Sequence, residues 1–252
     1  MLLSILFFLL SIIPSVLIIL WLKNRRREDA LYQKSCKSAL VRGLIVVLPI
    51  IGVSALFSIL NRVLQLTLLK DLNVLIYRAI YTFIVLAFAE ELVKFRAFQL
   101  LLKKRYNAYT WADVTAFMVI IGTGFGLIED IPYAIGASPM IMLVRGITMG
   151  HVGYGFMMGW FYGKRLYTGK KRYGVLSFLL PFLLHGLYDF SLSEELLAVN
   201  DDLAMIGVSL AVLDIVLLIL MIRFFRRSSR KECYNVPIIT LAEETGEGGA
   251  AL

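Results

Sequence analysis

Several ionisable side chains lie inside stretches that otherwise resemble apolar helix. They are Arg78, Glu90, Glu91, Lys94, Glu129, Arg145, His151, His185, Asp189 and Asp214. Such residues are costly within a membrane, and they usually have a function or a partner there. The chain contains 2 histidines, and both belong to this group. Imidazoles beside carboxylates are the usual partners for acid–base catalysis or metal binding, so these residues are the candidates for chemistry.

Two adjacent carboxylates begin the stretch E-E-L-V-K, which runs from Glu90 to Lys94. On a helix, Lys94 lies three and four residues beyond the two carboxylates and can reach either of them. We therefore expect Lys94 to pair with one carboxylate and to leave the other available as a base. The spacing alone does not distinguish Glu90 from Glu91.

Two further pairs have a spacing of four residues, which places both members on one helix face. Phe125 stands one turn before Glu129, and His185 stands one turn before Asp189. A carboxylate in the position of Asp189 can orient the imidazole and fix its tautomer. The second histidine, His151, is followed by small residues that let a neighbouring helix or a substrate approach closely.

Composition indicates which solvent surrounds these residues. The chain has 252 residues, of which 59% are hydrophobic and 17% are charged, and its mean hydropathy is +0.79. A soluble domain of this size could not bury so much apolar surface, so we expect lipid to be the solvent. Long, uniform apolar runs exclude the weak alternating pattern of an outer-membrane barrel. The predicted fold is all-α, a polytopic bundle that crosses the cell membrane several times.

The formal net charge of +8 is explained by the orientation of this bundle in the membrane. Most lysines and arginines gather in four clusters, at 23–37, 94–105, 164–172 and 223–231. Each cluster follows or flanks an apolar segment, as the positive-inside rule describes. We therefore expect the N-terminus outside, the C-terminus inside and no nucleic-acid partner. Cys36 and Cys233 then face the reducing side, and no disulfide is expected.

Seven spans are expected, at about 2–22, 40–60, 78–101, 111–134, 139–162, 175–192 and 203–224. The limits of the third and fourth spans follow from the depth in the membrane at which Glu90 and Glu129 must lie to share one site. A third span at 72–89 would leave Glu90 at one membrane edge, and a fourth span ending at Ile128 would leave Glu129 at the other. A shared site therefore requires a third span centred on Glu90 and a fourth span that continues beyond Glu129.

The chain is predicted to have three parts. Residues 1–38 would form an anchor helix and a basic cytoplasmic loop, residues 39–225 the membrane core, and residues 226–252 a cytoplasmic tail. The tail ends in a mixed, glycine-containing stretch that is typical of unstructured polypeptide.

Four stretches together resemble the PrsW family of intramembrane proteases. They are EELVK from Glu90, FGLIE from Phe125, HVGYG from His151 and HGLYD from His185. The resemblance covers about residues 78–192, in the expected order, and extends more loosely to the CAAX prenyl proteases and the Aph scaffold subunit of gamma-secretase. It implies peptide-bond hydrolysis in or next to the bilayer, with a membrane-anchored protein, such as an anti-sigma factor, as the substrate.

The resemblance also implies roles for the carboxylates and for the first histidine. Glu90 or Glu91 would activate a water molecule, and the other would pair with Lys94. His151 would help to hold or deprotonate that water. These roles agree with what hydrolysis in lipid needs, namely a polar cavity, a base and donors for the oxyanion.

The remaining motif residues would complete the site. His185, oriented by Asp189, would stabilise the oxyanion, and Glu129, which follows Phe125 by one turn, would complete the polar cluster. Glu129, His151 and His185, with one carboxylate of the EE pair and a water, would also suit zinc. A zinc mechanism and a metal-free glutamate mechanism both remain open at this point.

Two other functions fit some of these residues. A scaffold of the Aph type would use the polar cluster as a buried hydrogen-bond network between helices. A proton-coupled transporter would use the carboxylates and histidines as a relay, and Asp214 would suit it. The chain shows no internal repeat of the transporter kind, and an ion pair of Asp214 with Arg78 or Arg145 is the simpler expectation.

Overall fold

The computed structural model describes residues 2–67, 73–103, 108–136, 139–192, 202–228, 234, 237 and 238. Within these residues the chain is helical, apart from an isolated bridge between Thr110 and Pro237. In chain order the elements are α1 (Leu2–Asn24), α2 (Ala30–Ile45), α3 (Val47–Thr67), α4 (Val74–Ile80), the π-helical segment η1 (Tyr81–Ala87), α5 (Phe88–Leu102), α6 (Trp111–Gly136), α7 (Pro139–Thr148), α8 (Gly150–Thr168), α9 (Lys171–Ser191) and α11 (Asp202–Ser228). The all-α prediction is confirmed.

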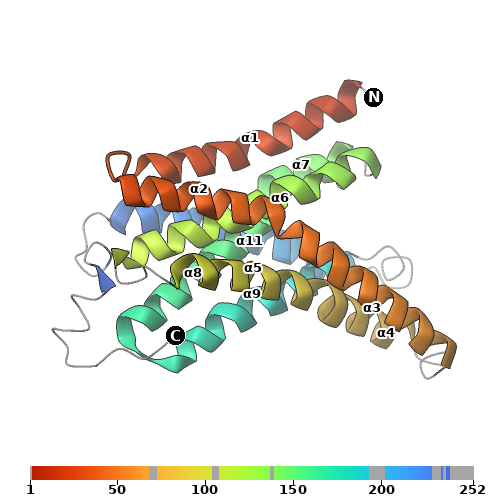
Figure 1. Ribbon diagram of the computed structural model, residues 1–252. Helices are drawn as coiled ribbons and strands as arrows, with labels where there is room; N and C mark the ends of the chain where they lie inside the picture. The colour runs from red at the N-terminus through yellow and green to blue at the C-terminus, as the bar shows by residue number, and fades with distance from the viewer. Residues whose placement is uncertain are drawn as a thin grey trace.

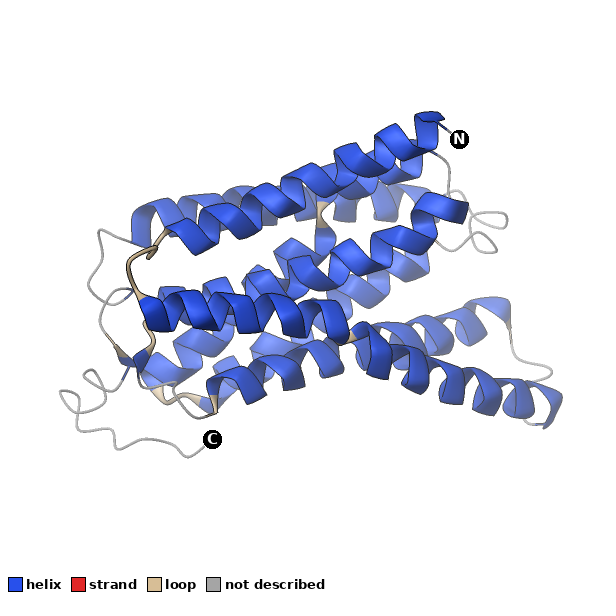
Figure 2. Ribbon diagram, turned by 45° about the horizontal axis from the view of Figure 1, so that its top comes forward, coloured by secondary structure: helices blue, strands red, loops and turns tan. Residues whose placement is uncertain are grey.

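Helix α6 forms the centre of the bundle (Figure 1). Its residues 111–125 are all buried, and it packs most extensively against α8 and α2. Helices α3 and α4 instead project away from the rest of the bundle (Figure 2). Their apolar side chains are largely exposed, for example Leu56 at 65% and Ile76 at 55%, as expected of surfaces that face lipid.

Four described helical segments are long and apolar enough to cross a membrane. They are Ala30–Val63, Trp111–Pro132, Lys171–Ser191 and Met205–Ser228. The protein is therefore a multi-pass membrane protein of the cell membrane. The expected total of seven spans, the orientation of the termini and the three-part division at residues 38 and 225 stay predictions.

The third and fourth segments lie where the depth argument placed them. Helix α4, η1 and α5 follow one another without a break from Val74 to Leu102, and Glu90 lies within this stretch. Helix α6 continues past Glu129 to Gly136. The widened turns of η1 come directly before the EELVK stretch, and such π-helical insertions frequently accompany functional sites.

Two segments that were expected to be continuous are interrupted. Segment 40–60 is interrupted at Val46 alone, between α2 and α3, and the backbone of Val46 stays in the right-handed helical region, so Ala30–Val63 remains one helical segment of spanning length. Pro49, which lacks a backbone N–H and restricts the residue before it, lies in the first turn of α3. Segment 139–162 divides at Met149, whose backbone is left-handed with φ of 49°. That conformation costs a non-glycine residue roughly 1–2 kcal/mol, so contacts formed by the folded bundle must hold it in place.

Candidate functional site

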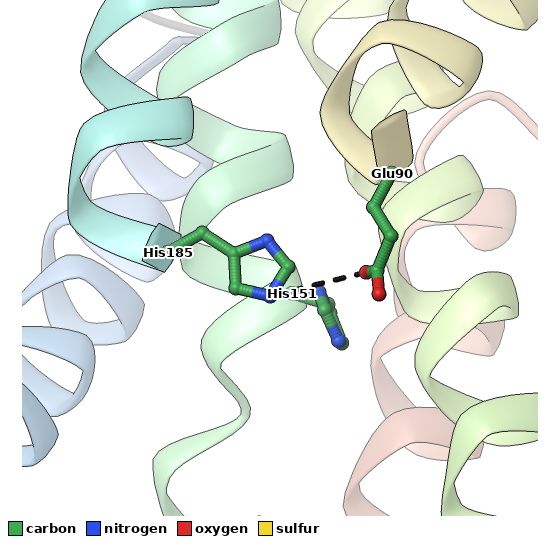
Figure 3. Close-up of side chains that lie close together, drawn as sticks. All are labelled: Glu90, His151 and His185. Carbon is green, nitrogen blue, oxygen red and sulfur yellow. Dashed lines mark ion pairs between the residues drawn. The ribbon is translucent and has the colours of Figure 1, made fainter. Parts of the chain in front are cut away.

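Glu90, His151 and His185 meet inside the bundle, although they come from α5, α8 and α9 (Figure 3). Each contributes one potential ligand atom, and all three atoms lie within 4.8 Å of one another. The His185 ring and the Glu90 carboxylate point toward each other, with His151 beside them. The expectation that these helices share one site is thereby confirmed.

The two adjacent carboxylates have different environments. Glu91 Oε1 lies 2.6 Å from Lys94 Nζ and 2.9 Å from His185 Nδ1, and its side chain is 1% exposed. Glu90 Oε2 lies 3.6 Å from Lys94 Nζ and is buried without a hydrogen-bond partner among the described residues. Glu91 is therefore the partner of Lys94, and Glu90 is the carboxylate left to face the histidines.

Lys94 is held on several sides at once. Its side chain is 2% exposed, and its ammonium group lies 4.3 Å from the centre of the Phe125 ring, a cation–π contact. The same group lies 3.3 Å from His151 Nδ1. In the FGLIE stretch, the Phe125 ring thus contacts Lys94, whereas the Glu129 carboxylate lies in a different part of the site.

Each imidazole has one nitrogen held by a carboxylate, from the partly exposed Glu129 for His151 and from the buried Glu91 for His185. His151 Nε2 lies 2.5 Å from Glu129 Oε2, which leaves Nδ1 as its other nitrogen. His185 Nδ1 lies 2.9 Å from Glu91 Oε1, and its Nε2 is 3.8 Å from Glu90 Oε2. Carboxylates that hold one nitrogen of a histidine in this way orient the ring and strengthen the other nitrogen as a ligand.

Asp189 lies beside His185, as its spacing predicts. Its Oδ2 atom is 3.2 Å from His185 Nε2, and its side chain is 32% exposed. The sequence did not indicate that Glu91, from another helix, would take the opposite nitrogen of the same ring. His185 therefore lies between two carboxylates, one completely buried and one accessible.

The donor set suits a catalytic zinc ion. Two imidazoles and one carboxylate leave a fourth position for water, which is a recurring zinc arrangement in hydrolases. Ligand atoms around tetrahedral zinc lie about 3.4 Å apart, so the present limit of 4.8 Å calls for a small inward movement of the side chains. Binding at His151 Nδ1 also requires Lys94 to keep its bond to Glu91 and to release His151.

Glu129 has a different position from the one expected for a ligand. We expected Glu129, His151 and His185, with one carboxylate of the EE pair, to form the metal set, and the three residues whose ligand atoms converge are Glu90, His151 and His185. Glu129 Oε2 contacts His151 Nε2 and also accepts from Arg145 Nη2 at 2.9 Å. The spacing of Phe125 and Glu129 places both on one helix face. It does not predict which nitrogen of His151 the carboxylate contacts.

Arg145 is a site residue that the sequence motifs did not reveal. It bridges Glu129 and Asp130, with its Nε atom 2.8 Å from Asp130 Oδ1. Its one sequence signal is that it is a charged residue in an apolar segment. Arg145 therefore pairs with these two carboxylates, where an ion pair with Asp214 was one expectation. Asp214 Oδ2 is buried with no hydrogen-bond partner in the described part of the chain.

A polar cavity of about 50 Å³ adjoins both histidines. Its lining includes Glu129, Arg145, Tyr154, Asp189 and Asp214. A buried water needs roughly 10–15 Å³ of such space and a few polar partners, so the cavity can hold a small number of water molecules. Water is thus accommodated next to the imidazoles in a protein whose outer surface is largely apolar.

Close packing of α6 against α8 determines where His151 lies. A methyl group on Gly122 would collide with the backbone carbonyl of His151, and one on Gly155 would come within 2.9 Å of the Met118 carbonyl oxygen. Small residues that allow backbones to approach are typical of membrane helix interfaces. The glycines on this interface therefore serve packing, which was one of their two expected roles.

Comparison of the sequence with known proteins identifies the protein family. The model of a family described as PrsW family intramembrane metalloprotease matches residues 38–222. A protein named Protease PrsW from Clostridioides difficile is 27% identical over 201 residues, covering 75% of this chain and 79% of the relative. Those of the same name from Shouchella clausii and Oceanobacillus iheyensis are 30% identical over 153 residues and 32% identical over 117 residues.

The aligned parts cover 59% of this chain and 71% of the Shouchella clausii protein, and 45% of this chain and 54% of the Oceanobacillus iheyensis protein. No solved structure matches the chain. The family match extends over most of the chain and includes Glu90, His151 and His185. The chain therefore belongs to the PrsW family of intramembrane metalloproteases.

Proposed function

We propose that the protein hydrolyses a peptide bond in or next to the membrane span of a protein substrate, using Glu90, His151 and His185. The observation that carries this proposal is the convergence of these three donors, with a carboxylate bonded to the opposite nitrogen of each imidazole. The cavity beside the two histidines provides room for the water that hydrolysis consumes.

Glu90, His151 and His185 would hold one zinc ion. Bound there, the ion would supply Lewis acidity toward the scissile carbonyl and the attacking water. The protein contributes the fixed geometry. Glu129 and Glu91 keep the two rings oriented, and Arg145 keeps Glu129 in place.

Glu90 is the proposed proton acceptor. Its Oε2 atom, which lies 3.8 Å from His185 Nε2 and has no hydrogen-bond partner among the described residues, is the oxygen that would ligate the ion, and its other oxygen would accept a proton from the water. Glu91 is unsuited to this role because Lys94 and His185 both occupy its Oε1 atom. Asp189 Oδ2 lies 3.2 Å from His185 Nε2, so binding of the ion at this nitrogen would require Asp189 to release it.

The substrate would be a membrane-anchored protein. By its resemblance to the PrsW family, the chain would make the first cut in an anti-sigma factor and so begin a stress response. The site supports the reaction class and an intramembrane location, and the identity of the substrate is the part of the proposal that rests on resemblance alone.

The test is cleavage of a single-span substrate in proteoliposomes. Wild type would be compared with Glu90→Gln, His151→Ala and His185→Ala, and with Gly52→Ala as a matched control on exposed α3, where an added methyl meets no atom within 4 Å. We expect the three site variants to lose at least about a hundredfold in rate and the control to cleave normally. Wild-type rates in the site variants would leave a non-catalytic scaffold as the better account.

A further inference from the structure

A second polar hollow lies at the far end of the bundle from the α3–α4 projection. Its volume is about 490 Å³, within the range of ligand sites. It forms where α1 ends, α6 begins and α11 ends, and these ends lie side by side (Figure 1). Arg25 Nη2 bonds to Ser228 Oγ across 203 positions of the sequence. The fold thus joins two of the basic clusters seen in the sequence.

Guanidinium groups and one carboxylate supply the charge of this hollow. Arg25, Arg26 and Arg226 line it together with Asp113. Arg26 already pairs with Asp29 and with Asp113 Oδ2. Among the described residues that line the hollow, Arg25 and Arg226 are therefore the cations available to a ligand, and arginine recognises phosphate with two parallel hydrogen bonds.

Two polar atoms of the lining are buried without a hydrogen-bond partner among the described residues. They are Arg25 Nη1, a donor, and Asp113 Oδ1, an acceptor. Asp113 is 1% exposed, and a buried polar group without a partner costs about 1–3 kcal/mol. A ligand that satisfies both atoms must offer an acceptor to the arginine and a donor to the carboxylate.

The surroundings of the hollow indicate where such a ligand comes from. Trp21 and Phe225 form its apolar side, with their rings 5.8 Å apart, and tryptophan is enriched at membrane interfaces. Along α1, Leu17 and Leu20 are 59% and 49% exposed, as expected of a lipid-facing surface. A lipid whose chains lie along α1 would bring its headgroup to the arginines.

We propose that this hollow binds a phospholipid headgroup that carries both a phosphate and a hydrogen-bond donor, such as phosphoglycerol or phosphoethanolamine. The phosphate contacts Arg25 and Arg226, and the hydroxyl or ammonium group contacts Asp113. Phosphocholine has the phosphate but no donor, so it leaves Asp113 Oδ1 without a partner. The site is separate from the histidine cluster and does not depend on the proposed protease activity.

The test is native mass spectrometry of the full-length protein with phosphatidylglycerol or phosphatidylcholine of identical chains. We expect wild type to retain about tenfold more phosphatidylglycerol than phosphatidylcholine, as one charge-assisted hydrogen bond would give. Arg25→Gln and Arg226→Gln should each lower the retention of both lipids, because both lipids carry the phosphate, and should leave the preference that Asp113 confers largely in place. Arg227→Gln is the matched control, because Arg227 is the next residue of α11, has the same charge and is exposed.

Three results would overturn the proposal. They are equal retention of the two lipids by wild type, an equal loss in Arg227→Gln, and displacement of phosphatidylglycerol by inorganic phosphate at equimolar concentration, which would point to a free anion. Arg25 also packs on Phe225, with its guanidinium 4.7 Å from the ring centre, so its variant requires a check of the unfolding midpoint. Arg226 is exposed, and its variant keeps the test valid if Arg25→Gln is unstable.

Discussion

Lys94 Nζ lies 2.6 Å from Glu91 Oε1, and the two side chains are 2% and 1% exposed. This ion pair distinguishes the two adjacent glutamates, because Glu91 and not Glu90 is the close partner of Lys94. Glu91 balances the buried ammonium and contacts His185 Nδ1, so in the proposed function Glu90 is the carboxylate that remains for the reacting groups. The proposal therefore gives the first glutamate of the EELVK stretch the functional role and the second a supporting role.

Glu91→Gln should destabilise the protein, whereas Glu90→Gln should inactivate it. Removing one partner of a buried pair leaves the other charge uncompensated and typically costs 3–5 kcal/mol. We expect Glu91→Gln to lower the free energy of unfolding by about 3 kcal/mol and Glu90→Gln to change it by less than about 1 kcal/mol. Unfolding followed in detergent, with cleavage measured on the same samples, checks both. Equal destabilisation by the two substitutions would contradict the assignment.

A double-mutant cycle on Lys94 and Glu91 should show strong coupling. Lys94→Met alone leaves the Glu91 carboxylate buried without its counter-ion. Glu91→Gln alone leaves the Lys94 ammonium buried without its close counter-ion. Because the double variant removes both charges of the pair, it should recover at least about 1.5 kcal/mol relative to the sum of the single changes. Additive losses would show that the pair is energetically unimportant. Cleavage should stay low in the double variant, since His185 loses its partner.

Arg145 acts as a positioning residue through Glu129. Arg145→Gln removes the donors that hold Glu129 and Asp130, and the loss of a partner behind a metal-binding histidine typically costs 10–100-fold in affinity or activity. We expect a zinc affinity that is lower by about tenfold and a kcat that falls with it. Arg145→Lys keeps the charge but not the two-pronged geometry, and it should fall between Gln and wild type. An unchanged zinc affinity in Arg145→Gln would contradict this role.

Gly122→Ala should displace His151 by separating α6 from α8. The added methyl meets the His151 carbonyl, and overpacking of this kind typically costs 1–3 kcal/mol. We expect a lower unfolding midpoint and a fall of about a hundredfold in cleavage, because a misplacement of about 1 Å has that effect. Gly52→Ala adds the same methyl to exposed α3, and it should leave activity unchanged while stabilising the helix by up to about 1 kcal/mol.

The sequence was informative where a depth constraint could be applied. Because Glu90 and Glu129 were expected to share one site, the helix that carries Glu90 had to continue well beyond it, and α6 had to continue beyond Glu129. The structure has both features, since α5 ends at Leu102 and α6 ends at Gly136. Helical spacing likewise placed Lys94 and Asp189 beside their partners. These contacts lie within single helices, where a spacing of three or four residues is enough to predict them.

The contacts between helices could not be predicted in this way. The break at Met149 is held by packing, and no proline announces it. It separates Arg145 from His151, so the chain Arg145–Glu129–His151 depends on a turn that the sequence pattern does not show. For the same reason the sequence grouped Glu129 with both histidines and one carboxylate of the EE pair, and it did not indicate that Glu129 would contact His151 Nε2.

Restoration of cleavage by zinc is the most direct test of the three-residue centre. Wild type, Glu90→Gln and His185→Ala would be stripped with a chelator in proteoliposomes that contain a single-span substrate, and one equivalent of zinc would then be returned. Cleavage by wild type should stop and then recover to its initial rate, while neither variant recovers. Cleavage by wild type that continues undiminished after chelation, or recovery of Glu90→Gln to the wild-type rate, would contradict a metal centre formed by Glu90, His151 and His185.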